Sequence, residues 1–456
     1  MTRARKMLLA LAVLDAASVL VVFNLVILLR GLGGVQVVLG PLTVPLVVMA
    51  VAISLIDGYS IRTDMLSLDY ASQHAIAVGS ALLVTLLATY AFFPGGYELQ
   101  SSRIVIALSY LVLIPLTLSY RRVLFQRTLA TRGARSLVFL GDEASCREFR
   151  EQCDALGMTQ RVIFTVINEA SAAPFVEHEL PRPRLFSEVL EDIRGRDLPV
   201  EAIVLRESSR ELPSDTSRQL VELFFKGVPT YTLELFHQVY WRKIPLYRLN
   251  QTWLFQEGFQ IAREPVFERV KRVADLLLAA VALLVAGPLI LLGALAVWLE
   301  DRSPPVFSQW RIGKNHVPFR LYKLRSMRPN AGGALYTQRD DDRITRVGRF
   351  LRATRLDEFP QLWNVLRGDM SLIGPRAEWD QLVERYEREI PCYHFRHLVK
   401  PGITGWAQVN YPYGASLEDT LRKLEYDLYY IRHFSFSLDA SIVLKTIHVM
   451  LFGKGR

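Results

Sequence analysis

The stretch VADLLLAAVALLVAGPLILLGALAVWL, from Val273 to Leu299, decides how the chain relates to a membrane. It is long enough to cross a bilayer, since a helix needs about 20 apolar residues to do so. Pro288 lies near its centre and has no N–H for the carbonyl of Leu284, so we expect a sharp bend there. The stretch is therefore either a kinked transmembrane helix or a helix that enters the membrane, turns, and leaves on the same side.

Four other apolar stretches precede this one and bear on that choice. They cover roughly residues 7–29, 42–56, 74–93 and 104–118. The second is marginal in length for a span. The first continues into the second without a clear cleavage site, which is not the pattern of a signal peptide. We therefore predict a four-span membrane helix bundle over residues 1–130.

Basic residues orient this bundle. They precede the first span and follow the fourth, at Arg3, Arg5, Lys6, Arg121, Arg122, Arg127, Arg132 and Arg135. The two loops expected on the other side hold only Arg30 and Arg103. Positive charge marks the cytoplasmic side, so both ends of the bundle are expected there. A fifth full crossing would put the basic C-terminal part outside. Asp15 and Asp57, near span ends, are interpreted as interfacial or inter-helix polar contacts.

A small doubly wound, Rossmann-like α/β domain is predicted over residues 131–262. Three short apolar runs read as buried parallel strands: SLVFLGD (Ser136–Asp142), RVIFTVI (Arg161–Ile167) and EAIVLRE (Glu201–Glu207). A dinucleotide site needs three spaced glycines. Only Gly141 is present, and Asp142 and Glu143 follow it. We expect a structural or regulatory domain that binds no dinucleotide.

Composition limits the classes of partner. Hydrophobic residues make up 51% of the 456 residues, and the net charge is +9. Such a charge suits nucleic acid, anionic lipid or a polyphosphate substrate. The three cysteines form no CxxC pair, which argues against a disulfide framework and suits a reducing compartment.

An acidic pair stands in a segment rich in arginine and lysine after Glu300. Asp357 and Glu358 precede Phe359-Pro360 and a helical run, a pattern that by itself fits an ordinary helix N-terminus. Arginines recur every third residue before it, at Arg343, Arg346, Arg349, Arg352 and Arg355. This spacing drifts about 60° per step around an α-helix, so they cannot share one narrow face. Some are expected to face an anionic substrate and others acidic lipid headgroups.

Several motifs in this segment follow one another in a recognisable order. They are SQWRIGKNHVPFRLYKLRSM (Ser308–Met327), DDRITRVGRFLRATRLDEFPQLWNVLRGDMSLIGPR (Asp341–Arg376) and KPGITGWAQVN (Lys400–Asn410), with Lys271, Arg272 and Asp275 before the apolar stretch. Together they resemble the bacterial sugar transferases, or polyprenyl-phosphate sugar-1-phosphate transferases. The front half resembles the large members that initiate exopolysaccharide synthesis. The resemblance implies a mostly helical catalytic domain over residues 263–456, with a re-entrant helix at 273–299 bent at Pro288.

The resemblance also implies a covalent mechanism, because LDEFPQLWNVL carries the family's Asp-Glu-x-Pro-Gln core. Asp357 would attack the phosphate that bears the sugar of a nucleotide-sugar, expected to be a UDP-sugar. Nucleoside monophosphate would leave, and polyprenyl phosphate would take the phospho-sugar. Carboxylates can form such acyl-phosphates. Glu358 would help to hold Mg²⁺ or position the nucleophile, and Asp357 would be a second metal ligand.

Cations near the motifs are predicted to bind the diphosphate, by the fork of arginine or the point charge of lysine. They are Lys271, Arg272, Lys323, Arg325, Arg352, Arg355 and Arg376. Gln408 and Asn410 are predicted to recognise uridine or sugar. Ala377 stands where the family often has a further proline, which leaves the following loop unassigned. The expected partners are a nucleotide-sugar, polyprenyl (undecaprenyl) phosphate, membrane lipid and a second copy in a homodimer, without nucleic acid. The expected location is the bacterial inner (cytoplasmic) membrane, with the catalytic domain in the cytoplasm.

Two alternative functions and one alternative metal site fit the sequence less well. A membrane-bound nucleotide-sugar dehydratase or epimerase would need the glycine fingerprint and a Tyr-x-x-x-Lys dyad, but Tyr426 is followed four residues later by Tyr430. A non-catalytic scaffold for polysaccharide assembly would not need the intact Asp-Glu pair. Cys392, His394 and His397 suggest a zinc cluster, yet a fourth ligand at suitable spacing is missing.

Overall fold

The computed structural model divides the chain into two compact units. It describes residues 3–30, 40–60, 63–92, 103–132, 136–158, 160–168, 181–195, 198–206, 212–246, 265–328, 341–412, 414 and 416–452. One unit holds Met1–Leu25, Tyr59–Ala71 and Leu111–Arg242, and the other holds Val26–Gly58, Ser72–Tyr110 and Lys243–Arg456. Each unit is described by itself. The predicted boundaries at residues 130, 262 and 263 stay predictions.

In the described part of the chain, four helices contain stretches long and apolar enough to cross a membrane. They are α1 (Arg3–Leu29), α3 (Leu68–Phe92), α4 (Arg103–Arg132) and α9 (Pro265–Asp301). The second predicted span corresponds to α2 (Thr43–Leu55), which has only 13 residues. At 1.5 Å per residue this is about 20 Å, shorter than the roughly 30 Å hydrocarbon core. Among the described residues, the predicted four-span bundle thus contains three full-length helices and one short one.

An ion pair joins α1 to α4. Both terminal nitrogens of Arg121 donate to the carboxylate of Asp15, at 2.7 and 2.5 Å, and both side chains are buried. The hydroxyl of Tyr59 donates to the same carboxylate at 2.6 Å, and that of Tyr120 also donates to it. Charged groups inside membrane helices need such partners. The prediction of an inter-helix contact is confirmed for Asp15.

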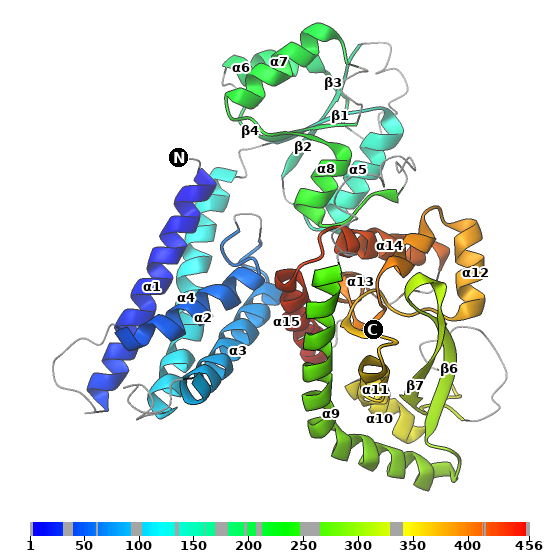
Figure 1. The fold of residues 1–456 in the computed structure, drawn as a ribbon. Coiled ribbons are helices and arrows are strands. Elements are labelled where there is room, and N and C mark those ends of the chain that lie inside the picture. The colour runs from blue at the N-terminus through cyan, green and yellow to red at the C-terminus, as the bar shows by residue number, and fades with distance from the viewer. Residues whose placement is uncertain are drawn as a thin grey trace. The chain divides into compact units, whose positions relative to one another are not determined.

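The middle of the chain forms a five-stranded parallel sheet in the order β3-β2-β1-β4-β5. Its strands are β1 (Ser136–Leu140), β2 (Arg161–Val166), β3 (Arg184–Leu185), β4 (Val200–Leu205) and β5 (Thr230–Thr232). The three predicted strands, β1, β2 and β4, are confirmed. Helices cover both faces (Figure 1): α5 (Glu143–Ala155), α6 (Phe186–Gly195), α7 (Ser214–Phe225) and α8 (Leu233–Phe236). Alternate residues of β1 explain this, because Phe139 packs towards α5 while Val138 packs towards α6.

The turn after β1 carries an aspartate at the start of α5 and does not form a phosphate-binding loop. Asp142 caps α5 by accepting from the backbone N–H of Ser145 at 3.1 Å. Its other oxygen pairs with Arg206 at 2.5 Å. The N–H groups and dipole that could attract a phosphate at this helix start are therefore directed at a carboxylate of the chain itself.

The C-terminal part is built around an antiparallel hairpin and several short helices. Its elements after α9 are β6 (Val306–Ile312), β7 (Pro318–Leu324), α10 (Arg346–Thr354), α11 (Gln361–Arg367), β8 (Ser371–Ile373), α12 (Asp380–Glu389), β9 (Gly402–Thr404), α13 (Trp406–Asn410), α14 (Leu417–Arg432) and α15 (Phe436–Phe452). The 3₁₀ segments η9 (Lys314–His316), η10 (Leu356–Glu358) and η11 (Tyr393–Leu398) connect them. Large aromatic side chains, among them Trp406 and Tyr430, fill the core around α14.

Helix α9 lies along this body and bends on the way, as expected from Pro288 (Figure 1). One side of it is buried: Ala279 and Ala286 pack against the hairpin and α11. The other side exposes large aliphatic side chains such as Leu284 and Leu291, at 79% and 72%. A helix with one face packed and one apolar face open is suited to a lipid environment.

Candidate active site

The Asp-Glu pair lies in a tight junction between two helices. Thr345 caps the start of α10, accepting from Gly348 N–H at 2.9 Å. The helix ends at Thr354, and the next residue, Arg355, caps it with a left-handed φ of 56°. The chain then forms η10, which carries Asp357 and Glu358 directly into α11. This reversal holds both carboxylates against β7 instead of leaving them on an open helix end.

Glu358 is surrounded by cations from three separate segments. One of its oxygens accepts from Lys323 Nζ of β7 at 3.1 Å and from Arg376 at 3.0 Å. Arg355 lies 3.9 Å from the other oxygen. Burial would raise the pKa of Glu358, but Lys323, Arg376 and Arg355 outweigh it and hold this pKa well below its usual range. Glu358 is therefore ionised and fixed in place.

Asp357 has the opposite environment. Its side chain is buried, and no hydrogen bond or salt bridge reaches its carboxylate from another residue in the described part of the chain. Burial and the neighbouring charge of Glu358 raise its pKa above the ordinary value, against the opposing effect of Lys323. Adjacent carboxylates whose environments separate their pKa values commonly have different chemical roles. Here one is held by cations and the other is available to react.

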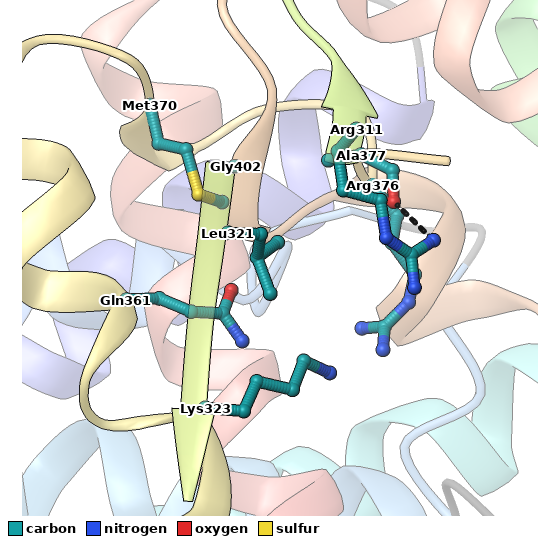
Figure 2. Close-up of a pocket in the computed structure, with 8 residues that line it drawn as sticks. All are labelled: Arg311, Leu321, Lys323, Gln361, Met370, Arg376, Ala377 and Gly402. Atoms are coloured by element: carbon teal, nitrogen blue, oxygen red, sulfur yellow. Dashed lines mark hydrogen bonds between the residues drawn. The ribbon is translucent and has the colours of Figure 1, made fainter. Parts of the chain in front are cut away.

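A small pocket adjoins the pair. Its lining residues are Arg311, Leu321, Lys323, Gln361, Met370, Arg376, Ala377 and Gly402. Figure 2 shows the ends of Lys323 and Arg376 near one another with the Gln361 amide across from them, while the guanidinium of Arg311 donates to the carbonyl of Ala377. Burial lowers the pKa of both Lys323 and Arg311. Three cations that line one pocket favour an anionic ligand such as a diphosphate.

Close backbone packing places Arg376 in this pocket. The N–H of Gly402 donates to the carbonyl of Pro375 at 2.9 Å, beside the β8–β9 pair. A Cβ on Gly405 would lie 2.1 Å from the carbonyl oxygen of Gly374, closer than real contacts allow. The glycines of KPGITG therefore permit the approach that positions the GPR turn.

Lys271 and Arg272, predicted to bind substrate, lie outside the pocket lining. Lys271 Nζ pairs with Asp439 of α15 at 2.5 Å. Arg272 donates to the carbonyls of Val365, at a short distance, and of Leu366, at 2.7 Å. Arg272 thereby joins the start of α9 to the last turn of α11. Asp275 of the same helix accepts from the backbone N–H of Leu372 at 3.1 Å.

Arg325, Arg352 and Gln408 also make contacts within the fold. Arg325 binds both oxygens of Asp301, at 2.5 and 2.6 Å, and so joins the hairpin to the end of α9. Arg352 donates to the hydroxyl of Ser326 at 2.8 Å, and Gln408 to the carbonyl of Ile403 at 3.1 Å.

Asn410, like Gln408, was predicted to recognise uridine or sugar. It accepts from Lys445 at 2.8 Å. The structure thus brings Lys323, Arg355 and Arg376 to the acidic pair, while the substrate roles of all these residues stay predictions.

Two polar lining residues, Arg311 and Gln361, were not singled out from the sequence. Arg311 donates to the carbonyl of Ala377 at 3.2 Å, while its Nε is buried without a hydrogen-bond partner in the described part of the chain. Both residues stand inside the quoted motifs, Arg311 in SQWRIGK and Gln361 in the Asp-Glu-x-Pro-Gln core. The sequence signal that could have identified them was their position within these motifs, Arg311 on strand β6 and Gln361 at the start of α11.

The acidic pair can accommodate the magnesium ion that the resemblance implies. Mg²⁺ binds through one or two carboxylates together with substrate phosphates and water. Asp357 offers a carboxylate free of partners among the described residues, whereas one Glu358 oxygen already accepts from Lys323 and Arg376. The donor set fits an ion held by Asp357 and by phosphate oxygens.

A basic pocket beside an acidic pair, on a body that carries a bent apolar helix, is the arrangement of a membrane-associated transferase. The family model described as "Bacterial sugar transferase" matches residues 266–453. The chain belongs to the bacterial sugar transferase family, which confirms the predicted resemblance.

Three relatives illustrate the similarity. The chain is 40% identical over 257 residues to the UDP-N-acetylgalactosamine-undecaprenyl-phosphate N-acetylgalactosaminephosphotransferase of Aeromonas hydrophila, covering 56% of this chain and 60% of the relative. It is 43% identical to the UDP-glucose:undecaprenyl-phosphate glucose-1-phosphate transferase of Escherichia coli (strain K12), covering 39% of each chain. It is 39% identical to the exopolysaccharide production protein PSS of Rhizobium leguminosarum bv. phaseoli, covering 39% of this chain and 93% of the relative. The chain thus matches less than two thirds of the length of the first two relatives.

Proposed function

We propose that the chain transfers a sugar-1-phosphate from a UDP-sugar to undecaprenyl phosphate, giving undecaprenyl diphosphate sugar and UMP, and so initiates an exopolysaccharide or related glycan. The observation that carries this proposal is the unpartnered carboxylate of Asp357 beside Glu358, which Lys323 and Arg376 hold at 3.1 and 3.0 Å. The printed names of the relatives support the substrate class.

The proposed reaction has two displacements at one phosphorus atom. An oxygen of Asp357 attacks the phosphorus that bears the sugar, and the bond from that phosphorus to the oxygen of UMP breaks. UMP leaves with the electron pair. A phosphate oxygen of undecaprenyl phosphate then attacks the same phosphorus, the acyl-phosphate bond breaks, and the Asp357 carboxylate is regenerated. Splitting one transfer into two in this way needs a nucleophile without a competing partner.

Charge neutralisation is the main task of the surrounding residues in phosphoryl transfer. Arg311, Lys323 and Arg376 line the pocket and would bind the diphosphate oxygens. Glu358 would keep Lys323 and Arg376 in position between turnovers. Mg²⁺, when bound to Asp357 and the phosphates, would neutralise further charge on the leaving group.

Helix α9 is proposed to be re-entrant. Arg272 near its start contacts α11, and Asp301 at its end contacts Arg325, so both ends are fastened to the same body. A straight helix of its 37 residues would be about 55 Å long and would separate those ends across a bilayer. The bend supports a hairpin in the inner membrane with the catalytic body in the cytoplasm. The expected homodimer stays a prediction.

The function is tested by trapping the intermediate. Purified full-length chain is incubated with Mg²⁺ and a panel of UDP-sugars without lipid acceptor, and peptides are analysed by mass spectrometry. We expect a phospho-sugar adduct on Asp357 that disappears when undecaprenyl phosphate is added. Glu384→Gln, an exposed acid on α12, is the matched control and should form the same adduct. Turnover by Asp357→Asn at a near-normal rate would exclude the covalent role.

A further inference from the structure

Three side chains far apart in the sequence meet beside the β6–β7 hairpin. They are His316 of η9, Glu387 of α12 and His397 of η11, and their ligand atoms all lie within 4.8 Å of one another. His316 Nδ1 is 3.4 Å from a Glu387 oxygen, and His397 Nε2 is 4.0 Å from the same oxygen. Tetrahedral ligands at metal bonds of about 2.0–2.1 Å stand about 3.4 Å apart. The three atoms are thus close to the spacing that one ion would impose.

His397 supplies the observation that points to a ligand. The residue is 5% exposed, and its Nε2 is buried without a hydrogen-bond partner in the described part of the chain. The ring also hydrogen bonds to the backbone of Gly313, and since Nε2 has no partner, this bond uses Nδ1. Metal-binding histidines are commonly oriented by a backbone bond through the other ring nitrogen. An unpaired buried nitrogen otherwise costs stability.

The backbone at His316 supports a role beyond the turn itself. Asn315 and His316 have φ values of 53° and 61°, and Val317 N–H closes the turn onto the Lys314 carbonyl at 3.2 Å. Turns with positive φ at both central residues are usually formed by Asn-Gly. A histidine therefore stands where glycine would fit with less strain, and strained residues persist where the site needs them.

We propose that His316, Glu387 and His397 form a binding site for Zn²⁺ or a similar borderline divalent ion, with the fourth position taken by water. Two imidazoles and one carboxylate suit such ions better than Mg²⁺ or Ca²⁺. Arg396, the charged residue that acts most strongly on His397, is paired with Asp427 at 2.9 Å. Cys392 and His394, which the sequence grouped with His397, are not members of this cluster.

The proposed ion would join the hairpin turn, α12 and η11. These segments also support the pocket: Arg396 donates to the carbonyl of Arg376 at 2.9 Å, and the N–H of Ile312, next to Arg311, donates to the carbonyl of Glu378 at 3.2 Å. The site would therefore be structural, and it is independent of the proposed transfer reaction.

The test uses full-length chain without a polyhistidine tag, purified in detergent and stripped of metal. Zn²⁺ binding is measured by equilibrium dialysis, and Co²⁺ is added as a spectroscopic probe. We expect one Zn²⁺ per chain, a visible Co²⁺ absorption typical of a tetrahedral site that Zn²⁺ bleaches, and a Tm that rises with Zn²⁺. His316→Gly should abolish all three signals while relieving the turn, so their loss cannot be attributed to unfolding.

His394→Gln is the matched control and should keep stoichiometric binding. Glu387→Gln should weaken Zn²⁺ binding by about tenfold or more, since one of three protein ligands is lost. Zn²⁺ bound equally well by His316→Gly, or no binding by the unaltered chain, would overturn the proposal. Loss of binding in His394→Gln would also overturn it, because a different ligand set would be responsible. None of these readouts depends on transferase activity.

Discussion

Asp142 and Asp357 both stand just before a helix, yet their surroundings differ completely. Asp142 is exposed, caps α5 and pairs with Arg206 of the neighbouring strand end. Asp357 is buried, has no partner among the described residues and lies beside a pocket with three cations. An acid at a helix start is common for electrostatic reasons alone. The difference shows that burial and cations brought from distant segments turn such an acid into a candidate nucleophile.

The largest expected effect separates these two aspartates. Asp357→Asn should lower kcat by about a thousandfold or more, because the nucleophile is lost. Asp142→Ala should leave kcat within about twofold and lower stability by about 1 kcal/mol, the usual cost of losing an N-cap side chain. Transfer of labelled sugar phosphate to undecaprenyl phosphate measures the first effect, and thermal unfolding measures the second. Equal loss of activity in both variants would remove the distinction.

The next effect separates two arginines within the catalytic body. Arg376→Ala should lower kcat/KM by about a hundredfold, because a pocket cation directed at developing charge is lost. Arg325→Ala should mainly lower stability, by about 1–3 kcal/mol, because it releases the charged contact to Asp301 at the end of α9. Steady-state kinetics and denaturant unfolding in detergent are compared. If Arg376 only stabilises the fold, Arg376→Ala will lower the free energy of unfolding while the folded protein keeps its kcat/KM. That outcome would contradict the predicted role in the pocket.

A third effect concerns the backbone that positions the GPR turn. Gly405→Ala should destabilise the body by about 2–3 kcal/mol, because its Cβ would overlap the Gly374 carbonyl. Gly287→Ala is the matched control, since a Cβ there would meet no atom within 4 Å. Thermal unfolding of both variants is the measurement, and equal Tm values would contradict this account of the turn.

The smallest expected effect is on the pH dependence of stability, which should differ in sign between the carboxylates of Glu358 and Asp357. Glu358 has a lowered pKa in the folded state, so its stabilisation is present above its unfolded pKa and is lost as pH falls through the folded one. Asp357 has a raised pKa, so its ionised form costs stability above its unfolded pKa. At neutral pH Glu358→Gln should therefore lower stability and Asp357→Asn raise it, each by on the order of 1 kcal/mol.

The difference in stability between each of these variants and the unaltered chain should become smaller as the pH is lowered through the acidic range. Tm measured across pH checks the signs. A stabilising Glu358→Gln would show that Lys323 and Arg376 do not hold this carboxylate as described.

Local patterns in the sequence were sufficient for some parts of this fold. The strands β1, β2 and β4, the bend of α9 and the acidic pair follow from residue order and spacing, whereas the hairpin β6–β7 was not predicted. The pairing of Arg272 with Leu366 does not, because the two residues are 94 positions apart and meet only through folding. For the same reason Cys392, His394 and His397 were grouped as sequence neighbours, while His316 and Glu387 reach His397 in space. The short length of α2 was visible only as a marginal apolar run.

The ion pair between α1 and α4 has a consequence for biosynthesis. Arg121 follows Asp15 by 106 residues in the chain. At a synthesis rate of about 5–20 residues per second, Asp15 waits roughly 5–20 seconds for its partner. A lone carboxylate in lipid is costly, so the first helix is expected to stay beside the insertion machinery during this interval. Arg121 is thus needed at the moment when nascent helices leave that machinery, before any enzyme has been assembled.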